Sequence, residues 1–366
     1  MARLKNSVGI WAFGTNTTRF MPQGYHPEYA KEASEERAKR ASEGLGIWAD
    51  GFEFHYPGEI DEKSHRKIES ILHDNDHDIY AIALGAHSIP RFANGSFVNP
   101  KKELRKEAVE MAKRAADLAS VLDARFIIWP GNEGYNYPNQ ADYEKIWNDF
   151  IDGVGEVVQH AHDKGVTIFL EDKNSEPKMR ILMRDQGMSI FMVNEFKERG
   201  YDVSRVKINM DWQHLLMRGE NLPEYARLLH MKGLLGHQHA NSGWGTFDDD
   251  NMVGASFIEQ TLGLAIELRL CNYGAGGERI GFDLFPYTEN QVEAVKQSIL
   301  NWDCLDSFAE KLTSPPGLYR KRLLKARREM DAVAVTKIVY EAVFGLNESY
   351  VNRLREERIA ERKARK

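Results

Sequence analysis

The chain has little cysteine and no long apolar run. Its 366 residues include only Cys271 and Cys304, too few for a disulfide framework or a cysteine-rich zinc site. Sparse cysteine is typical of a reducing compartment, so we expect a cytoplasmic protein. No stretch approaches the roughly 18 consecutive apolar residues of a membrane helix. The first segment, MARLKNSVGIWAFG, also lacks the pattern of a signal peptide. We therefore expect no membrane partner.

An excess of basic charge is missing as well. Lysine and arginine number 49 against 55 acidic residues, a formal net charge of -6, which argues against a nucleic-acid-binding surface. Hydrophobic residues make up 42% and charged residues 28%, the balance of a globular protein with a full core. No low-complexity segment or Pro/Gly-rich linker divides the chain.

Short β-rich runs alternate with longer charged stretches of helical spacing. The expected strands lie at 7–13, 51–55, 79–86, 125–130, 166–171, 205–210, 233–239 and 279–284. The expected helices lie at 28–45, 61–73, 101–122, 141–163, 178–199, 254–270 and 288–301, with a weaker pattern over 212–232. Eight such βα units predict an α/β protein with a closed (β/α)8 TIM barrel over residues 1–304. An open doubly wound sheet is the alternative, because periodicity does not show closure.

The segment from residue 305 onwards has a different character. Pro315-Pro316-Gly317 interrupts the helical pattern, and a strongly charged helical region follows. Residues 305–366 are expected to form a helical C-terminal arm, either solvated or wrapped around a neighbouring subunit. The apolar run over 333–344 favours subunit contacts, and hence a homodimer or homotetramer. Acids interleaved with the bases argue against nucleic-acid binding.

Polar and aromatic side chains gather at the expected strand ends, where a barrel places its active site. In chain order they are Trp11, His55, His87, Trp129, Glu133, Glu171, Lys173, Asp211, His214, His237, His239, Asp248, Asp249, Asp250 and Asp283. Buried carboxylates at this density repel one another unless cations lie among them. Oxygen ligands with a few imidazoles suit Mg²⁺, Mn²⁺ or Co²⁺. One or two divalent ions are therefore the expected cofactors.

Single members of this set also have plainer interpretations. Asp283 alone resembles a helix N-cap, residues 248–250 resemble a solvated turn, and Glu133 could only brace its loop. The histidines and tryptophans could be core residues. It is the joint pattern that favours a metal centre.

Eight motifs, in the order of the expected strands, resemble the xylose isomerase and L-rhamnose isomerase group of metal-dependent sugar isomerases. They are GIWAFG (9–14), FEFH (52–55), WPGNEGYNYPNQ (129–140), EDKNSEP (171–177), Asp211-x-x-His214, HQHAN (237–241), FDDDNMVGA (247–255) and FDLFPY (282–287). The resemblance extends over most of residues 7–300. It implies a (β/α)8 barrel that interconverts an aldose and a ketose, with L-rhamnose, D-xylose or a related rare sugar as substrate.

The resemblance implies two metal sites. The ligands of the first would be Glu171, Asp211, His239 and Asp283. The ligands of the second would be Asp211, His214, Asp248 and Asp250. Xylose isomerases carry Glu and Asp where this chain has Asp211 and His239, so the set looks like the rhamnose isomerase version. Because imidazole favours later metals, Mn²⁺ or Co²⁺ is expected to serve better than Mg²⁺.

Roles for single residues follow from the same resemblance. The expected catalytic residues are His55, Lys173, His214 and Asp283, and the expected substrate-binding residues are Trp11, His87, Trp129 and Glu133. Lys173 would neutralise a substrate oxygen near C1, and the two tryptophans would keep water away. Xylose isomerases carry aspartates after the strand-2 histidine, one of which orients it. Here Tyr56-Pro57-Gly58-Glu59 follows instead, so His55 is expected to lack that partner.

The expected reaction is a two-metal hydride shift between C2 and C1 of the sugar. The main alternative is a single-metal epimerase or β-eliminating lyase acting on a keto-sugar, with His55, His87 or Glu133 as the base. A barrel that cleaves damaged DNA and a non-catalytic metal-binding barrel are further alternatives.

Overall fold

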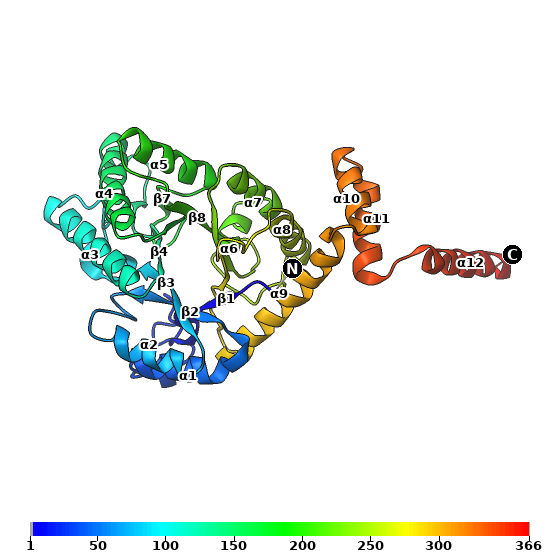
Figure 1. Ribbon diagram of the computed structural model, residues 1–366, viewed down its shortest axis with the longest axis horizontal. Helices are drawn as coiled ribbons and strands as arrows, with labels where there is room; N and C mark the ends of the chain where they lie inside the picture. The colour runs from blue at the N-terminus through cyan, green and yellow to red at the C-terminus, as the bar shows by residue number, and fades with distance from the viewer. Residues whose placement is uncertain (1–2, 366) are drawn as a thin grey trace.

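The computed structural model describes residues 3–365, and its centre is a closed barrel of eight parallel strands (Figure 1). The strands are β1 (Asn6–Gly9), β2 (Gly51–Tyr56), β3 (Asp78–Leu84), β4 (Arg125–Ile128), β6 (Ile168–Glu171), β8 (Val206–Asp211), β9 (Leu235–Ala240) and β10 (Ile280–Phe282). Their order around the barrel is β1-β10-β9-β8-β6-β4-β3-β2. This closure confirms the predicted (β/α)8 fold and all eight expected strands, and it excludes the open sheet.

Helices form a ring outside the strands (Figure 1). They are α1 (Ser34–Leu45), α2 (His65–His73), α3 (Lys102–Val121), α4 (Tyr143–Asp163), α5 (Gln186–Glu198), α6 (Trp212–Leu216), α7 (Leu222–Met231), α8 (Ile258–Leu270) and α9 (Gln291–Thr313). Short 3-10 helices are η1 (Ile10–Phe13), η2 (Pro27–Tyr29), η3 (Gly46–Trp48), η4 (Ala86–Ser88) and η5 (Pro90–Phe92). Between residues 3 and 365, no helix is both long enough and apolar enough to cross a membrane.

Several helices begin later than the sequence predicts, among them α1, which begins at Ser34 instead of residue 28. In two regions a cap sets the observed start. The expected helix over 178–199 begins only at Gln186, since the Asp185 side chain accepts the Met188 N–H as an N-cap. The residues before it contain β7 (Arg180–Ile181), which pairs antiparallel with β5 (Gly134–Tyr135). The weak pattern over 212–232 divides into α6 and α7, and Asn221 caps the second of these.

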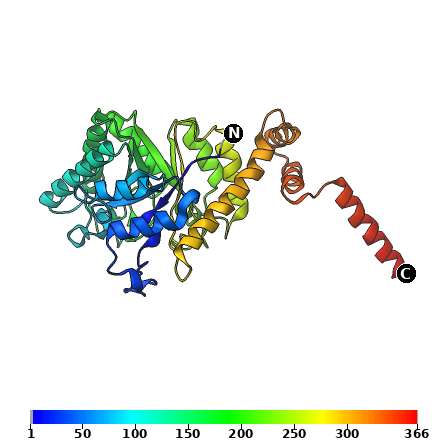
Figure 2. The ribbon, with the colours of Figure 1, turned by 60° about the horizontal axis from the view of Figure 1, so that its bottom comes forward.

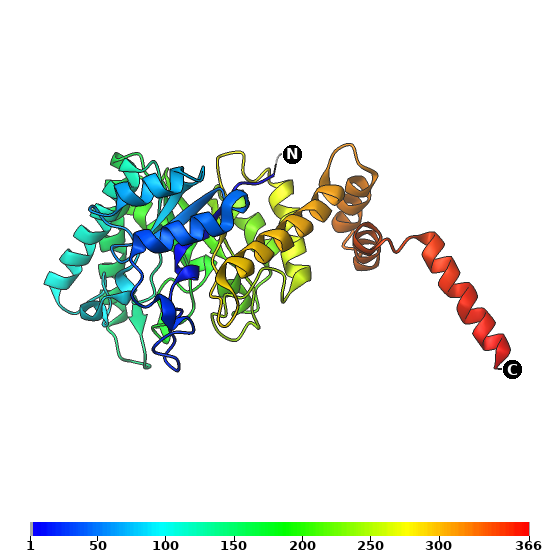
Figure 3. The same cartoon turned by 90° about the horizontal axis from the view of Figure 1, so that it is seen from below.

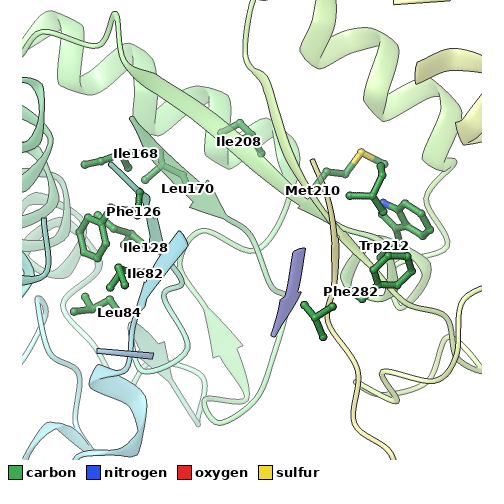
Figure 4. Close-up of a cluster of buried hydrophobic side chains, with 14 of the residues drawn as sticks. Ile82, Leu84, Phe126, Ile128, Ile168, Leu170, Ile208, Met210, Trp212 and Phe282 are labelled. Carbon is green, nitrogen blue, oxygen red and sulfur yellow. The ribbon is translucent and has the colours of Figure 1, made fainter. Parts of the chain in front are cut away.

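The main core lies between the strands and the helix ring. Alternate strand residues point outward and are buried under the helices. Figure 4 shows part of this layer: Ile82, Leu84, Phe126, Ile128, Ile168, Leu170, Ile208, Met210, Trp212 and Phe282. The intervening residues Ala81, Ala83, Ile127 and Phe169 belong to a second cluster, on the opposite face of the strands. The inward face of each strand can therefore carry polar groups without interrupting the main core.

The C-terminal helices are α10 (Leu318–Arg328), α11 (Ala332–Phe344) and α12 (Glu348–Ala364). The first two pack against each other and against α9. Helix α12 projects away from the barrel, and none of its residues is buried (Figures 1 and 3). Helix α9 runs without a break across the expected boundary at residue 304. The division at that residue and the subunit contacts of the arm stay predictions.

Candidate metal centre

The ends of the strands surround one cavity of about 150 Å³. Its lining residues are Trp11, His55, Ala83, His87, Ile127, Trp129, Glu171, Lys173, His214, His239, Asp248 and Asp283. All of them except Ala83 and Ile127 belong to the set expected from the sequence. The segment between β1 and α1, drawn in dark blue, extends beyond the barrel (Figure 2).

The first group of candidate ligands is the one expected from the sequence. Donor atoms of Glu171, Asp211, His239 and Asp283 all lie within 4.8 Å of one another. The Nδ1 atom of His239 is 3.1 Å from Asp283 Oδ2, 3.2 Å from Glu171 Oε2 and 3.8 Å from Asp211 Oδ2. Ligands about 2.1 Å from one ion are separated by about 3.0–3.4 Å in octahedral or tetrahedral geometry. Because His239 Nδ1 also has no hydrogen-bond partner, the four residues fit a single divalent ion.

A second group shares Asp211 with the first and adds His214 and Asp248. Asp211 caps α6, and its side chain accepts the backbone N–H of His214 at 3.0 Å. The Nδ1–H of His214 donates to the carbonyl oxygen of Asp172 at 2.9 Å. The unprotonated Nε2 of a neutral His214 therefore lies toward Asp248 Oδ1, at 3.3 Å. This is the tautomer that a metal-binding histidine needs.

Asp250 lies beside the second group without joining it. The side-chain amide of Asn241 donates to Asp250 Oδ1 at 2.8 Å and to Asp211 Oδ2 at 3.1 Å, so it bridges the two carboxylates. Asp249 has a structural role instead. Its Oδ2 accepts the backbone N–H of Trp244 at 2.6 Å and the Gln213 amide at 3.1 Å.

The electrostatics of the cluster attract positive charge. Burial and the neighbouring carboxylates raise the pKa of Asp211 to about 7. Burial also raises the pKa of Asp250 well above its ordinary value, with Asp248 as the strongest neighbour. Burial lowers the pKa of His214, but the attraction of Asp211 and Asp248 outweighs it and raises this pKa to about 9. The fold thus holds a concentration of negative charge that divalent cations would compensate.

Lys173 is the one lysine or arginine among the residues that line the cavity. Its Nζ forms an ion pair with Asp248 Oδ2 and lies 5.0 Å from the centre of the Trp129 ring. Burial lowers the pKa of Lys173, but the attraction of Asp248 outweighs it, so the pKa lies above its usual value. Lys173 therefore carries a positive charge at neutral pH.

A row of rings lines one side of the cavity. The centroid of Trp11 is 4.4 Å from that of His55, His55 is 5.3 Å from His87, and His87 is 4.7 Å from Trp129. The indole Nε1–H of Trp11 donates to Asp283 Oδ1 at 2.6 Å. Burial lowers the pKa of His87 to about 3. These four rings form an apolar wall of the cavity, and the imidazole of His87 within it is neutral.

The expectation that His55 lacks an orienting carboxylate is wrong. Glu59 Oε2 accepts both the Nδ1–H of His55 at 3.1 Å and its backbone N–H at 2.8 Å. The other oxygen of Glu59 pairs with Arg37 at 3.2 Å. The signal in the sequence was an acid four residues after the histidine, at the end of the Tyr56-Pro57-Gly58-Glu59 run.

Glu133 does not line the cavity. Its carboxylate is buried and accepts the backbone N–H groups of Ser96 and Val98, both at 2.9 Å, and the Ser96 hydroxyl. Glu133 therefore braces a loop, which is the plainer interpretation that the sequence offered for it.

His237 belongs to neither ligand group that surrounds Asp211. Its ring lies on the same strand face as that of His239, as the two-residue spacing predicts, with the centroids 5.3 Å apart. Both histidines contact Glu53, a buried residue that the sequence analysis missed. The available signal was a glutamate inside the FEFH strand, two residues before His55 and so on the same face.

Comparisons with known proteins agree with this architecture. Residues 39–263 match the family model of the xylose isomerase-like TIM barrel. The xylose isomerase of Bacillus subtilis is 25% identical over 197 residues, which is 53% of this chain and 43% of that protein. The xylose isomerase of Bacillus pumilus is 26% identical over 157 residues, 42% of this chain and 34% of that protein. The chain thus spans less than half the length of these curated relatives.

Several solved structures with a similar fold are sugar epimerases. An L-ribulose 3-epimerase matches with a TM-score of 0.60 at 16% identity, over 86% of this chain and 99% of that one. The 3-keto-D-glucoside 4-epimerase of E. coli matches with a TM-score of 0.59 at 15% identity, over 82% and 99%. At these identities the likeness shows the fold alone. From the family match over residues 39–263, the chain belongs to the xylose isomerase-like TIM barrel family.

Proposed function

We propose that this protein is a divalent-metal-dependent isomerase that interconverts the aldose and ketose forms of a small free sugar. The observation that carries the proposal is the pair of ligand groups that share Asp211. In each group a histidine turns one ring nitrogen toward the carboxylates, while its other nitrogen contacts an oxygen outside the group. Two neighbouring ions would suit a 1,2-hydride shift, because each can polarise the oxygen on one of the two reacting carbons.

The proposed ions are Mn²⁺, Co²⁺ or Mg²⁺. Glu171, Asp211, His239 and Asp283 would hold the first, and Asp211, His214 and Asp248, with Asp250 nearby, would hold the second. When bound, such ions polarise the oxygens on two adjacent sugar carbons. The five carboxylates of these two groups and Asp250 carry a formal charge of about -5. Two divalent ions and the positive charge of Lys173 would bring the centre close to neutrality.

The chain's own residues would position the sugar and exclude water. Lys173 carries a positive charge at the cavity wall, where it would stabilise negative charge on a sugar oxygen. His55, held by Glu59, would bind a sugar hydroxyl. The rings of Trp11 and Trp129 would shield the reacting carbons from water, so that hydrogen moves within the sugar from C2 to C1 while the O2 proton moves to O1.

The size and charge of the cavity favour a free monosaccharide. Its volume of about 150 Å³ corresponds to about five water molecules at roughly 30 Å³ each. Lys173 is the one lysine or arginine in the lining, and Asp248 already pairs with it. A phosphate group would find no free lysine or arginine among these lining residues. We therefore propose L-rhamnose, D-xylose or a related rare sugar as the substrate.

A single-metal epimerase or β-eliminating lyase acting on a keto-sugar is the second candidate. The position of Asp250 outside the second ligand group favours this candidate. The ion pair between Lys173 and Asp248 favours it as well, because an oxygen of Asp248 is then already paired with a cation of the chain. A proton-transferring base, His55 or His87, would then act beside one ion at the first site.

Turnover in D2O separates the two candidates. Metal-stripped protein is reloaded with Mn²⁺, Co²⁺ or Mg²⁺ and mixed with L-rhamnose, D-xylose, L-lyxose and the corresponding ketoses, and NMR follows product and label. A ketose with little deuterium at C1 supports the hydride-shifting isomerase. Solvent deuterium at the reacting carbon supports the epimerase or lyase. Metal uptake without turnover of any of these free sugars contradicts the free-sugar isomerase.

A further inference from the structure

A buried carboxylate next to the metal centre contacts three donors from two other strands. Glu53 on β2 has no exposed surface. Its Oε1 accepts the Ser7 hydroxyl of β1 at 2.6 Å and the Nε2–H of His237 at 2.8 Å. Its Oε2 accepts the Nε2–H of His239 at 3.1 Å. A buried carboxylate without such partners would be strongly destabilising, so these contacts account for its place in the barrel.

Strand β10 leaves the space that this carboxylate needs. A Cβ atom at Gly281 would overlap both His237 Nε2 and Glu53 Oε1. Glycine at this position lets the side chains of β2 and β9 meet inside the barrel. The cluster of Ser7, Glu53, His237 and His239 is therefore built by three strands, β1, β2 and β9, and we call it the Glu53 network.

The Glu53 network fixes the protonation of His239. An ionised carboxylate accepts hydrogen bonds and donates none, so the Nε2 atom that faces Glu53 must carry the hydrogen. A neutral His239 then has its lone pair on Nδ1. That atom is the one that lies 3.1 Å from Asp283 Oδ2 and 3.2 Å from Glu171 Oε2 without a hydrogen-bond partner.

The contact between Glu53 and His239 also adds negative charge to the first metal site. The first ligand group contains three carboxylates and one neutral imidazole, and an imidazole supplies no negative charge of its own. A carboxylate on the outer nitrogen of a ligand histidine raises the basicity of the inner nitrogen. Glu53 thus contributes negative charge to the site through His239, without contacting the ion itself.

We infer that Glu53 is a positioning residue that holds His239 as an Nδ1 ligand of the first metal site. In the same network, His237 and Ser7 hold Glu53 in place. The inference rests on the metal centre of the proposed function, and it is independent of the sugar and of the reaction.

The tautomer of His239 in the unaltered protein is the first test. Histidine labelled with ¹⁵N in the Mg²⁺-loaded full chain reports by NMR which ring nitrogen carries the hydrogen, and the His239 signals are assigned by their loss in H239N. We expect hydrogen on Nε2 and none on Nδ1. Hydrogen on Nδ1 of His239 in the loaded protein would overturn the inference, whether or not any variant folds.

Metal affinity of E53Q is the second test, with S7A as its matched control. Glutamine has one acceptor oxygen and a donating amide, so it cannot accept from both histidines. Outer partners of this kind change metal affinity by about 10- to 100-fold, and we expect Mn²⁺ binding, measured by calorimetry without sugar, to weaken by that factor in E53Q. S7A removes one of the two donors to Glu53 Oε1 but leaves the contact between Glu53 Oε2 and His239, so its affinity should fall clearly less than that of E53Q.

The outcomes separate this inference from the proposed function. E53Q with an affinity within threefold of the wild type and an unchanged His239 tautomer would overturn the inference. A wild-type protein that binds Mn²⁺ with the expected tautomer, yet turns over no aldose, would contradict the proposed isomerase and leave the role of Glu53 supported.

Discussion

Removing the charge of Arg218 should destabilise the fold strongly and in a pH-dependent way. Arg218 pairs with Asp172 at 2.7 Å, and the two side chains are only 11% and 2% exposed. The carbonyl oxygen of Asp172 also accepts the hydrogen bond from His214. Arg218→Met keeps most of the side-chain volume but leaves the Asp172 carboxylate buried without a partner. Breaking a buried ion pair from one side costs about 3–5 kcal/mol.

The pH dependence has a definite sign. Burial raises the pKa of Asp172 in the folded protein even though Arg218 lowers it. Without Arg218 this pKa rises further, while in the unfolded chain it stays near 3.9, as is usual for aspartate. A carboxyl group with a raised folded-state pKa loses stability as the pH rises above the unfolded value, until the folded value is passed. The stability gap between variant and wild type should therefore be larger at pH 8 than at pH 5.

Urea unfolding of the metal-free proteins, followed by circular dichroism at both pH values, measures the gap. The double variant R218M/D172N removes both charges and should recover most of the loss. A cost below about 1 kcal/mol at pH 8, in the range of a surface ion pair, would refute the assignment of a buried ion pair. A gap that is equal at the two pH values would refute it as well.

Four further predictions follow from the site and the arm. K173M should bind Mn²⁺ but lose about 10²- to 10³-fold in sugar turnover, because a preorganised charge at the cavity wall is removed; turnover near the wild-type rate would exclude this role. W11F loses its indole donor to the partly buried carboxylate of Asp283, a contact worth about 1.5–3 kcal/mol, so kcat/KM should fall by at least about tenfold in the same assay. E59Q removes the charge that raises the pKa of His55, so NMR titration should show a lower pKa for that imidazole, and an unchanged value would argue against the contact. Deleting residues 346–366 removes a helix with no buried residue, so Tm should stay within about 2 °C, whereas light scattering should report a smaller assembly if the arm makes the predicted subunit contacts.

The sequence predicts the barrel well because its strands have a strong local signature. Runs such as 79–86 and 125–130 are apolar and bounded by charged helical stretches, and the structure places strands in both. Helix starts are harder to predict, since single side chains set them. Asp185 caps α5 at its start, and the residues before this cap include β7, which pairs with β5 about 45 positions earlier in the chain. Helix α9 continues past residue 304 to Thr313.

The candidate ligands could be predicted from their places at strand ends, because a barrel brings those ends together. Their hydrogen-bond partners could not. Glu53 and His237 are 184 positions apart, and they meet only because β1 and β10 close the barrel between β2 and β9. The partners of Asp250 and Glu133 likewise depend on loop conformations that have no periodic signature.

The number of Mn²⁺ ions that each chain binds tests the two-metal centre most directly. Titration of the metal-stripped protein, followed by electron paramagnetic resonance of the free ion, counts them without any assumption about the sugar. Two neighbouring sites predict two bound ions per chain, and one in H214N, which loses a ligand of the second site only. One ion in both proteins would contradict the two-metal isomerase.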